Sequence, residues 1–187
     1  MIGYREEISE SYVRSLKPPP GGWNSAIVSK DVKFIDSDAF RDSEIRSLTF
    51  EEGSELIGLD NYAFRYSNLE CIRIPASCYW IGEAAFAGTQ LKTIFFEPGS
   101  RLELICDSTF KKTRLDSMVI PASVVRIDRR AFYKSSLSSL TLEPGSLLEE
   151  IRESAFEGTA ISSITLPPSL KVLEKISFQD SALESIA

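Results

Sequence analysis

The 187-residue sequence contains no histidine, and this absence excludes several kinds of active site. Catalytic triads, cysteine–histidine pairs and zinc sites with imidazole ligands all require that side chain. Only three cysteines occur, Cys71, Cys78 and Cys106. Three cysteines fit neither a fully paired disulfide framework nor a four-ligand metal cluster. We therefore expect three free thiols, no metal and no cofactor.

The sequence also lacks long apolar runs and an excess of basic residues. It has no 18 consecutive apolar residues, and its first ten residues, MIGYREEISE, lack the apolar centre of a signal peptide. Neither a membrane span nor an export signal is therefore predicted for this chain. The 21 Lys and Arg against 27 Asp and Glu give a net charge of −6. That sign argues against a protein that binds nucleic acid through its phosphates.

What the sequence does contain is an internal repeat built around a phenylalanine. The intervals between successive anchor phenylalanines alternate between 24 and 22 residues, and the anchors are Phe40, Phe64, Phe86, Phe110, Phe132, Phe156 and Phe178. A constant period of this length is typical of solenoids. The alternation has a local cause, because the turn after the strand has three residues in one repeat type, as in Pro121-Ala122-Ser123, and five in the other, as in Glu97-Pro98-Gly99-Ser100-Arg101.

Apolar residues recur at fixed positions around each anchor. They stand eight and five residues before it and five, eight and ten residues after it; around Phe132 they are Val124, Ile127, Leu137, Leu140 and Leu142. The last two alternate across a strand and face the same side. We therefore expect one short strand per coil, with coils stacked at about 4.8 Å into a parallel sheet and like side chains above like.

Two further columns are polar or small. A hydroxyl stands three residues after every anchor, at Ser43, Ser67, Thr89, Thr113, Ser135, Thr159 and Ser181. We expect it to satisfy backbone groups at a sharp bend, so that Ser135→Ala costs about 1–3 kcal/mol. A small residue, such as Ala131, directly precedes most anchors and would allow a tight convex turn.

The two ends of the chain receive separate predictions. Apolar residues at three-to-four spacing within residues 1–17 predict a short amphipathic helix, so residues 1–22 are expected to form a helical cap followed by a Pro/Gly linker. Residues 23–187 are expected to form the repeat domain. The sequence stops midway through a strand, Ala182–Ala187, and an open strand edge predicts self-association there or a longer natural chain.

The pattern I-P-x-S-V-x-x-I-x-x-x-A-F-x-x-[ST]-x-L-x-x-[LI]-x-[LI], seen at Ile120–Leu142, resembles the BspA-like leucine-rich repeats of surface proteins. That family usually has cysteine where this chain has Ser or Thr, and a steadier period. The resemblance implies a right-handed leucine-rich-repeat solenoid with a parallel sheet on its concave face and short turns or 3-10 segments on its convex face. It also implies protein recognition or adhesion at a cell surface, and it carries over no catalytic residues.

Side chains that point outward from the strands would line the concave face. Most are Ser or Thr, but Arg73, Phe95 and Val119 fall on consecutive strands, with Cys71 and Thr93 beside them. An aromatic residue beside an arginine is typical of an interface hot spot. These five residues are the candidate binding patch.

Two charged groups are weaker candidates. Seven cations gather in two coils and form either a solvated face or a surface for an acidic partner: Lys111, Lys112, Arg114, Arg126, Arg129, Arg130 and Lys134. Glu51, Glu97 and Glu143 occur on alternate coils, roughly 10 Å apart, and we expect that spacing to limit repulsion rather than to provide an acid–base pair.

The sequence as a whole favours a non-enzymatic module for protein recognition or adhesion, with a protein partner. One alternative is a structural spacer in a longer repeat array. Another is a carboxylate-dependent hydrolase on a β-solenoid, but the outward strand positions from Ser47 to Thr165 contain no Asp or Glu.

Overall fold

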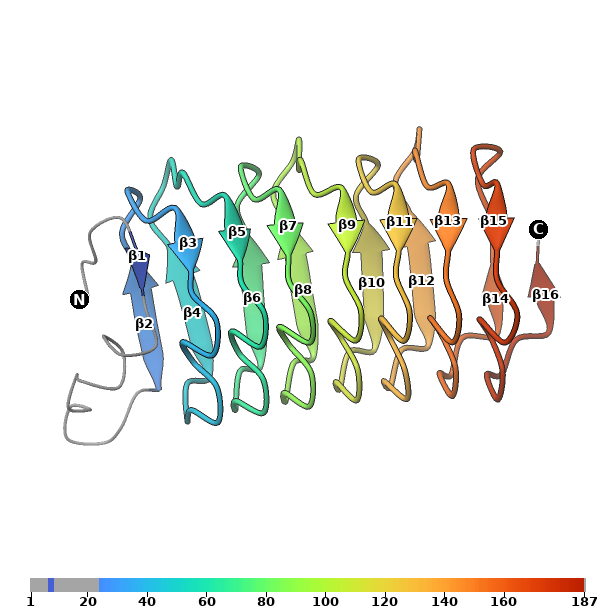
Figure 1. Ribbon diagram of the computed structural model, residues 1–187, viewed down its shortest axis with the longest axis horizontal. Coiled ribbons are helices and arrows are strands. Elements are labelled where there is room, and N and C mark those ends of the chain that lie inside the picture. Colours follow the sequence, from blue (N-terminus) through green and yellow to red (C-terminus); the bar gives the residue numbers. More distant parts are fainter. Residues whose placement is uncertain (1–6, 9–23, 187) are drawn as a thin grey trace.

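Each coil of the chain forms two short parallel strands on opposite sides of an apolar core, and the coils stack side by side along the long axis of the molecule (Figure 1). The structure, a computed structural model, describes residues 7–8 and 24–186. The even-numbered strands are the ones predicted from the repeat: β2 Ser25–Val28, β4 Ser47–Phe50, β6 Cys71–Ile74, β8 Thr93–Phe96, β10 Ser117–Ile120, β12 Ser139–Leu142, β14 Ser163–Ile164 and β16 Ser185–Ile186. We call the outward-pointing side of these strands the strand face.

The second row of strands was not predicted. Eight two-residue strands form one continuous parallel sheet: β1 Glu7–Ile8, β3 Phe34–Ile35, β5 Gly58–Leu59, β7 Trp80–Ile81, β9 Leu104–Ile105, β11 Arg126–Ile127, β13 Glu150–Ile151 and β15 Val172–Leu173. The prediction of one strand per coil was therefore wrong. Otherwise the side opposite the strand face consists of turns, and the described residues contain no helix and no 3-10 segment.

The anchor phenylalanines lie in single file through the core, as predicted. Neighbouring ring centroids are 5.0–5.5 Å apart and neighbouring ring planes differ by 2–17°. The rings from Phe64 to Phe156 are fully buried. Burial of a large apolar side chain contributes about 1.5–3 kcal/mol, so one anchor per coil, covered by the coils on both sides, is a main source of stability.

Sharp bends flank every anchor. The residues two before and two after each anchor have positive φ; they include Tyr62 (62°), Lys134 (52°) and Gly88 (71°). Most are not glycine, and a left-handed conformation costs such residues about 1–2 kcal/mol. Backbone hydrogen bonds between coils offset this cost. From Phe40 to Phe132, the anchor N–H and the N–H groups two residues to either side donate to the next coil; around Phe110 the acceptors are the carbonyls of Arg129, Ala131 and Tyr133.

The hydroxyl column behaves as predicted at five of its seven positions. The hydroxyls of Ser43, Thr89, Thr113, Thr159 and Ser181 donate to the carbonyl of their own anchor, at 2.6–2.9 Å. The buried hydroxyls of Ser67 and Ser135 have no hydrogen-bond partner among the described residues. The expected cost of Ser135→Ala therefore has no structural basis at that position.

The predicted N-terminal helix falls mostly on residues outside the described ranges. The two residues of it that are described, Glu7–Ile8, form β1, which pairs in parallel with β3. At these two positions the helix prediction was wrong, because the backbone pairs with the edge of the first coil instead of forming a turn of helix.

Candidate functional site

The predicted binding patch lies on the strand face. Register pairs Cys71 with Thr93 and Arg73 with Phe95 on the hydrogen-bonded strands β6 and β8. The Arg73 guanidinium carbon lies 5.7 Å from the centroid of the Phe95 ring, within the range of a cation–π contact. The Phe95 side chain is 54% exposed and Val119, on β10, is 51% exposed. The repeat pattern thus located two large apolar side chains that face solvent, Phe95 and Val119.

Pairing between the even-numbered strands follows the alternation of the repeat. Pairs 22 residues apart, such as β6 with β8 and β10 with β12, share four residues each. Across a 24-residue coil β4 and β6 share only two, and within residues 24–186 no pairing joins β8 to β10 or β12 to β14. The two extra turn residues move the chain away from its neighbour, and Phe96 and Leu142, which precede these longer turns, are only partly buried.

A groove lies at each unpaired position. The first, of about 370 Å³, runs across β8, β10 and β12, and we call it the Phe95 groove; its outward lining includes Thr93, Phe95, Ser117, Val119 and Thr141. It contains three of the five predicted patch residues, Thr93, Phe95 and Val119. Arg73 lies at its edge through its contact with Phe95.

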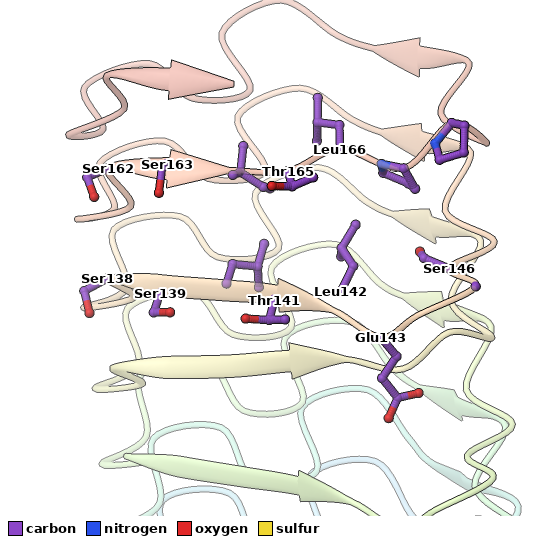
Figure 2. A pocket seen from close by; sticks show the side chains of 15 residues that line it. Ser138, Ser139, Thr141, Leu142, Glu143, Ser146, Ser162, Ser163, Thr165 and Leu166 are labelled. Atoms are coloured by element: carbon purple, nitrogen blue, oxygen red, sulfur yellow. The ribbon is translucent and has the colours of Figure 1, made fainter. Parts of the chain in front are cut away.

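The second groove, between β12 and β14, was not predicted. It has a volume of about 810 Å³, and hydroxyl side chains line it on two neighbouring rungs (Figure 2): Ser138, Ser139, Thr141, Ser146, Ser162, Ser163 and Thr165. Glu143 lies at its turn end. The only sequence signal for this groove was a 24-residue interval combined with hydroxyls on both strands.

The glutamates of the five-residue turns are occupied by backbone contacts. The carboxylates of Glu51, Glu97 and Glu143 accept hydrogen bonds from the backbone N–H of Lys30, Ala76 and Ala122 respectively, at 2.9–3.1 Å. Each carboxylate thereby ties its own turn to the three-residue turn of the preceding coil. These three glutamates therefore have a structural role, which the sequence analysis did not identify. The hydrolase alternative is not supported.

The three cysteines are all free, as predicted, and differ in accessibility. Cys78 is buried, and burial raises its pKa to about 12. Burial also raises the pKa of the half-buried Cys106, to about 11, with the Asp128 charge as a second cause. Cys71 is exposed on the strand face, next to the Phe95 groove.

Five of the seven predicted cations fall into two groups. Arg126 and Arg129 make ion pairs with Asp128 and Glu153, at 3.0 and 3.5 Å. Lys111, Arg130 and Lys134 instead surround the ring of Tyr133. No group of acidic residues or cysteines in the described ranges is arranged to hold a metal ion. Nor does a helix in those ranges have the length and hydropathy needed to cross a membrane.

Known proteins share both the repeat and the fold. The profile of the BspA type leucine-rich repeat region matches six copies, over residues 22–138 and 103–187. Among solved structures, the pneumococcal vaccine antigen PcpA is 23% identical, with a TM-score of 0.72 over 99% of this chain and 54% of that protein. This chain therefore spans about half the length of PcpA.

Two weaker structural matches are also leucine-rich repeat proteins. A leucine-rich cell surface protein from Faecalibacterium prausnitzii is 22% identical over 70% of this chain and 42% of that one, with a TM-score of 0.46. A leucine-rich repeat protein from Bacteroides ovatus is 21% identical over 87% and 54%, with a TM-score of 0.40. No curated protein matches this sequence. The family profile covers nearly the whole repeat region, so the chain belongs to the BspA type leucine-rich repeat family.

Proposed function

We propose that this chain is a non-enzymatic recognition module that binds a protein partner at a cell surface through the Phe95 groove. The observation that carries the proposal is the exposure of Phe95 and Val119 on either side of a groove, with Arg73 held against the Phe95 ring. Aromatic and arginine side chains in a partly enclosed site are the residues that most often dominate binding energy at interfaces. The repeat family agrees with such a role, and PcpA, which shares the fold, is a vaccine antigen.

Cys71 provides a direct test, because it is the exposed thiol and lies beside the groove. A photoactivatable cross-linker attached to Cys71 would capture a partner on intact cells, and Phe95→Ala with Val119→Ser should remove the cross-linked product. Ile27→Ser is the matched control, since Ile27 is also exposed on the strand face, at the equivalent position of β2. If Ile27→Ser also removed the cross-linked product, the proposal would be contradicted.

The spacer alternative makes the opposite prediction for the same experiment. If this chain only separates other domains, the product should persist in the Phe95→Ala, Val119→Ser variant or never form. Self-association through the outer edge of β16, where Ile186 is exposed, remains a separate prediction. Sedimentation at increasing protein concentration tests it, and a constant monomer mass would contradict it.

A further inference from the structure

One lateral edge of the solenoid carries cations that have no carboxylate partner. Lys111, Arg130 and Lys134 lie around the ring of Tyr133, with their charged groups 5.5, 5.9 and 5.2 Å from its centroid. Lys112 is the neighbour of Lys111 on the same bend, and its N–H donates to the Tyr133 carbonyl. We call these residues, together with Arg65 and Tyr66, the basic edge.

Three of the nearby acidic side chains have other partners, and Glu157, whose carbonyl accepts a hydrogen bond from the Lys134 N–H, makes no ion pair among the described residues. Glu153 pairs with Arg129, Asp128 pairs with Arg126, and Asp107 accepts a hydrogen bond from the Ser108 hydroxyl at 2.6 Å. Among the described residues, neither Lys112 nor any of the three cations around Tyr133 forms an ion pair. A protein of net charge −6 therefore presents a local positive field at this edge.

An exposed aromatic ring lies along the same edge, two coils before Lys112. Tyr66 is 51% exposed, and its ring lies across Gly88, where a Cβ would come within 2.4 Å of the ring. Arg65 donates a hydrogen bond to the Tyr66 hydroxyl at 3.1 Å, and its guanidinium carbon is 4.8 Å from the ring centroid. This hydrogen bond lowers the pKa of Tyr66, and the charges of Lys112 and Lys111, two coils further along, act in the same direction.

We propose that the basic edge binds an anionic polysaccharide, with Tyr66 as a platform for a sugar ring and Lys111, Lys112, Arg130 and Lys134 pairing with its sulfate or carboxylate groups. This site is distinct from the Phe95 groove and does not depend on the proposed function. The cations come from two adjacent coils, about 4.8 Å apart in a rigid stack, so they form a fixed cluster around Tyr133. Neighbouring anionic groups of a polysaccharide would complement that cluster.

The tyrosine platform favours a polysaccharide over other polyanions. The C–H groups of a pyranose face pack against an aromatic face, and the Tyr66 ring is held flat over a residue without a side chain. An acidic peptide would use the cations but has no ring to place on Tyr66. Single-stranded nucleic acid could stack a base there, so the test includes it.

The first experiment measures affinity of the intact chain for heparin oligosaccharides, used as the sulfated probe, by titration calorimetry. Binding should weaken as salt is added, because salt screens exposed charges. The double variant Lys111→Gln, Lys134→Gln should lower affinity about tenfold, because it loses two exposed charge contacts. Lys30→Gln with Arg101→Gln removes the same charge from the turns that follow β2 and β8, away from the anchor bends, and should change affinity less than about twofold. An equal loss in both variants would overturn the proposal, because net charge alone would then explain binding.

The second experiment isolates the platform. Tyr66→Ala should lower heparin affinity about fivefold to tenfold, since aromatic stacking contributes at the scale of one such contact, while circular dichroism shows an unchanged fold. Polyglutamate, single-stranded DNA and neutral dextran serve as comparison probes and should bind at least tenfold more weakly. Equal binding of polyglutamate or DNA, or no effect of Tyr66→Ala, would overturn the assignment to a polysaccharide.

Discussion

Phe132 illustrates how a single residue stabilises this protein. Its ring is fully buried and lies between those of Phe110 and Phe156, at 5.2 and 5.1 Å. Phe132→Ala should therefore lower the free energy of unfolding by about 3–5 kcal/mol, the range for a buried phenylalanine. Urea denaturation measures this loss. Phe178→Ala is the matched control, because Phe178 is only partly buried and has one stacked neighbour, and its loss should be clearly smaller.

The hydroxyl column gives a second residue-scale prediction. Thr113→Val keeps the shape of a buried side chain but removes the hydroxyl that donates to the Phe110 carbonyl at 2.9 Å, so it should cost about 0.5–1.5 kcal/mol. Ser135→Ala removes a buried hydroxyl that has no partner among the described residues and should cost less than about 0.5 kcal/mol. Thermal or urea unfolding compares the two, and equal costs would contradict the hydrogen-bond assignment.

Cysteine reactivity is a third prediction at this scale. The thiolate is the reactive form, and raised pKa values of about 12 for Cys78 and about 11 for Cys106 leave almost no thiolate in either at pH 8. Iodoacetamide at pH 8 should therefore modify Cys71 first, and modification of Cys106 should increase as the pH rises towards 11. Peptide mass spectrometry measures each site. Modification of Cys78 at a rate similar to Cys71 would show that the coil opens.

At the scale of the elements, the 24-residue coils weaken the sheet. β10 is paired on one side only, with β12, whereas β6 is paired on both sides, with β4 and β8. Hydrogen exchange in β10 should therefore be faster than in β6. Replacing Glu97–Arg101 with Pro-Ala-Ser should slow exchange in β10, because a three-residue turn would bring it beside β8. Equal protection of β10 and β6 before the replacement would contradict this account.

The sequence predicted the elements that depend on regular apolar spacing. The phenylalanine stack and the even-numbered strands follow from columns in which every member is apolar. The short strands were missed because only one of their two residues belongs to such a column, while the other varies from Gly58 to Trp80 to Arg126. The left-handed bends were missed because Tyr62 and Lys134, unlike glycine, do not signal positive φ.

The candidate site was predicted in part for a related reason. Arg73, Phe95 and Val119 could be placed on one face because the repeat fixes the strand register. The grooves depend on which strands remain unpaired, and that depends on how two extra residues in a turn displace the chain. The basic edge required the contacts of Tyr133 and Tyr66, which lie on bends whose geometry the pattern did not reveal.

For the whole molecule, the account requires that stability arises between neighbouring coils and not from a shared central core. In a stacked array each repeat contacts only its neighbours, so energetic coupling should fall to zero beyond the adjacent coil. The described coils contain one anchor phenylalanine ring each, about 5 Å from the next. These rings allow the coupling to be measured directly.

The decisive measurement is a pair of double-mutant cycles with Phe→Leu substitutions, in which urea unfolding gives the coupling energy. Phe110 and Phe132, with ring centroids 5.2 Å apart, should couple by about 0.5–1.5 kcal/mol. Phe86 and Phe132 are separated by the Phe110 ring and should show additive effects within about 0.5 kcal/mol. Equal coupling in the two cycles, or additivity in both, would contradict the stacked arrangement.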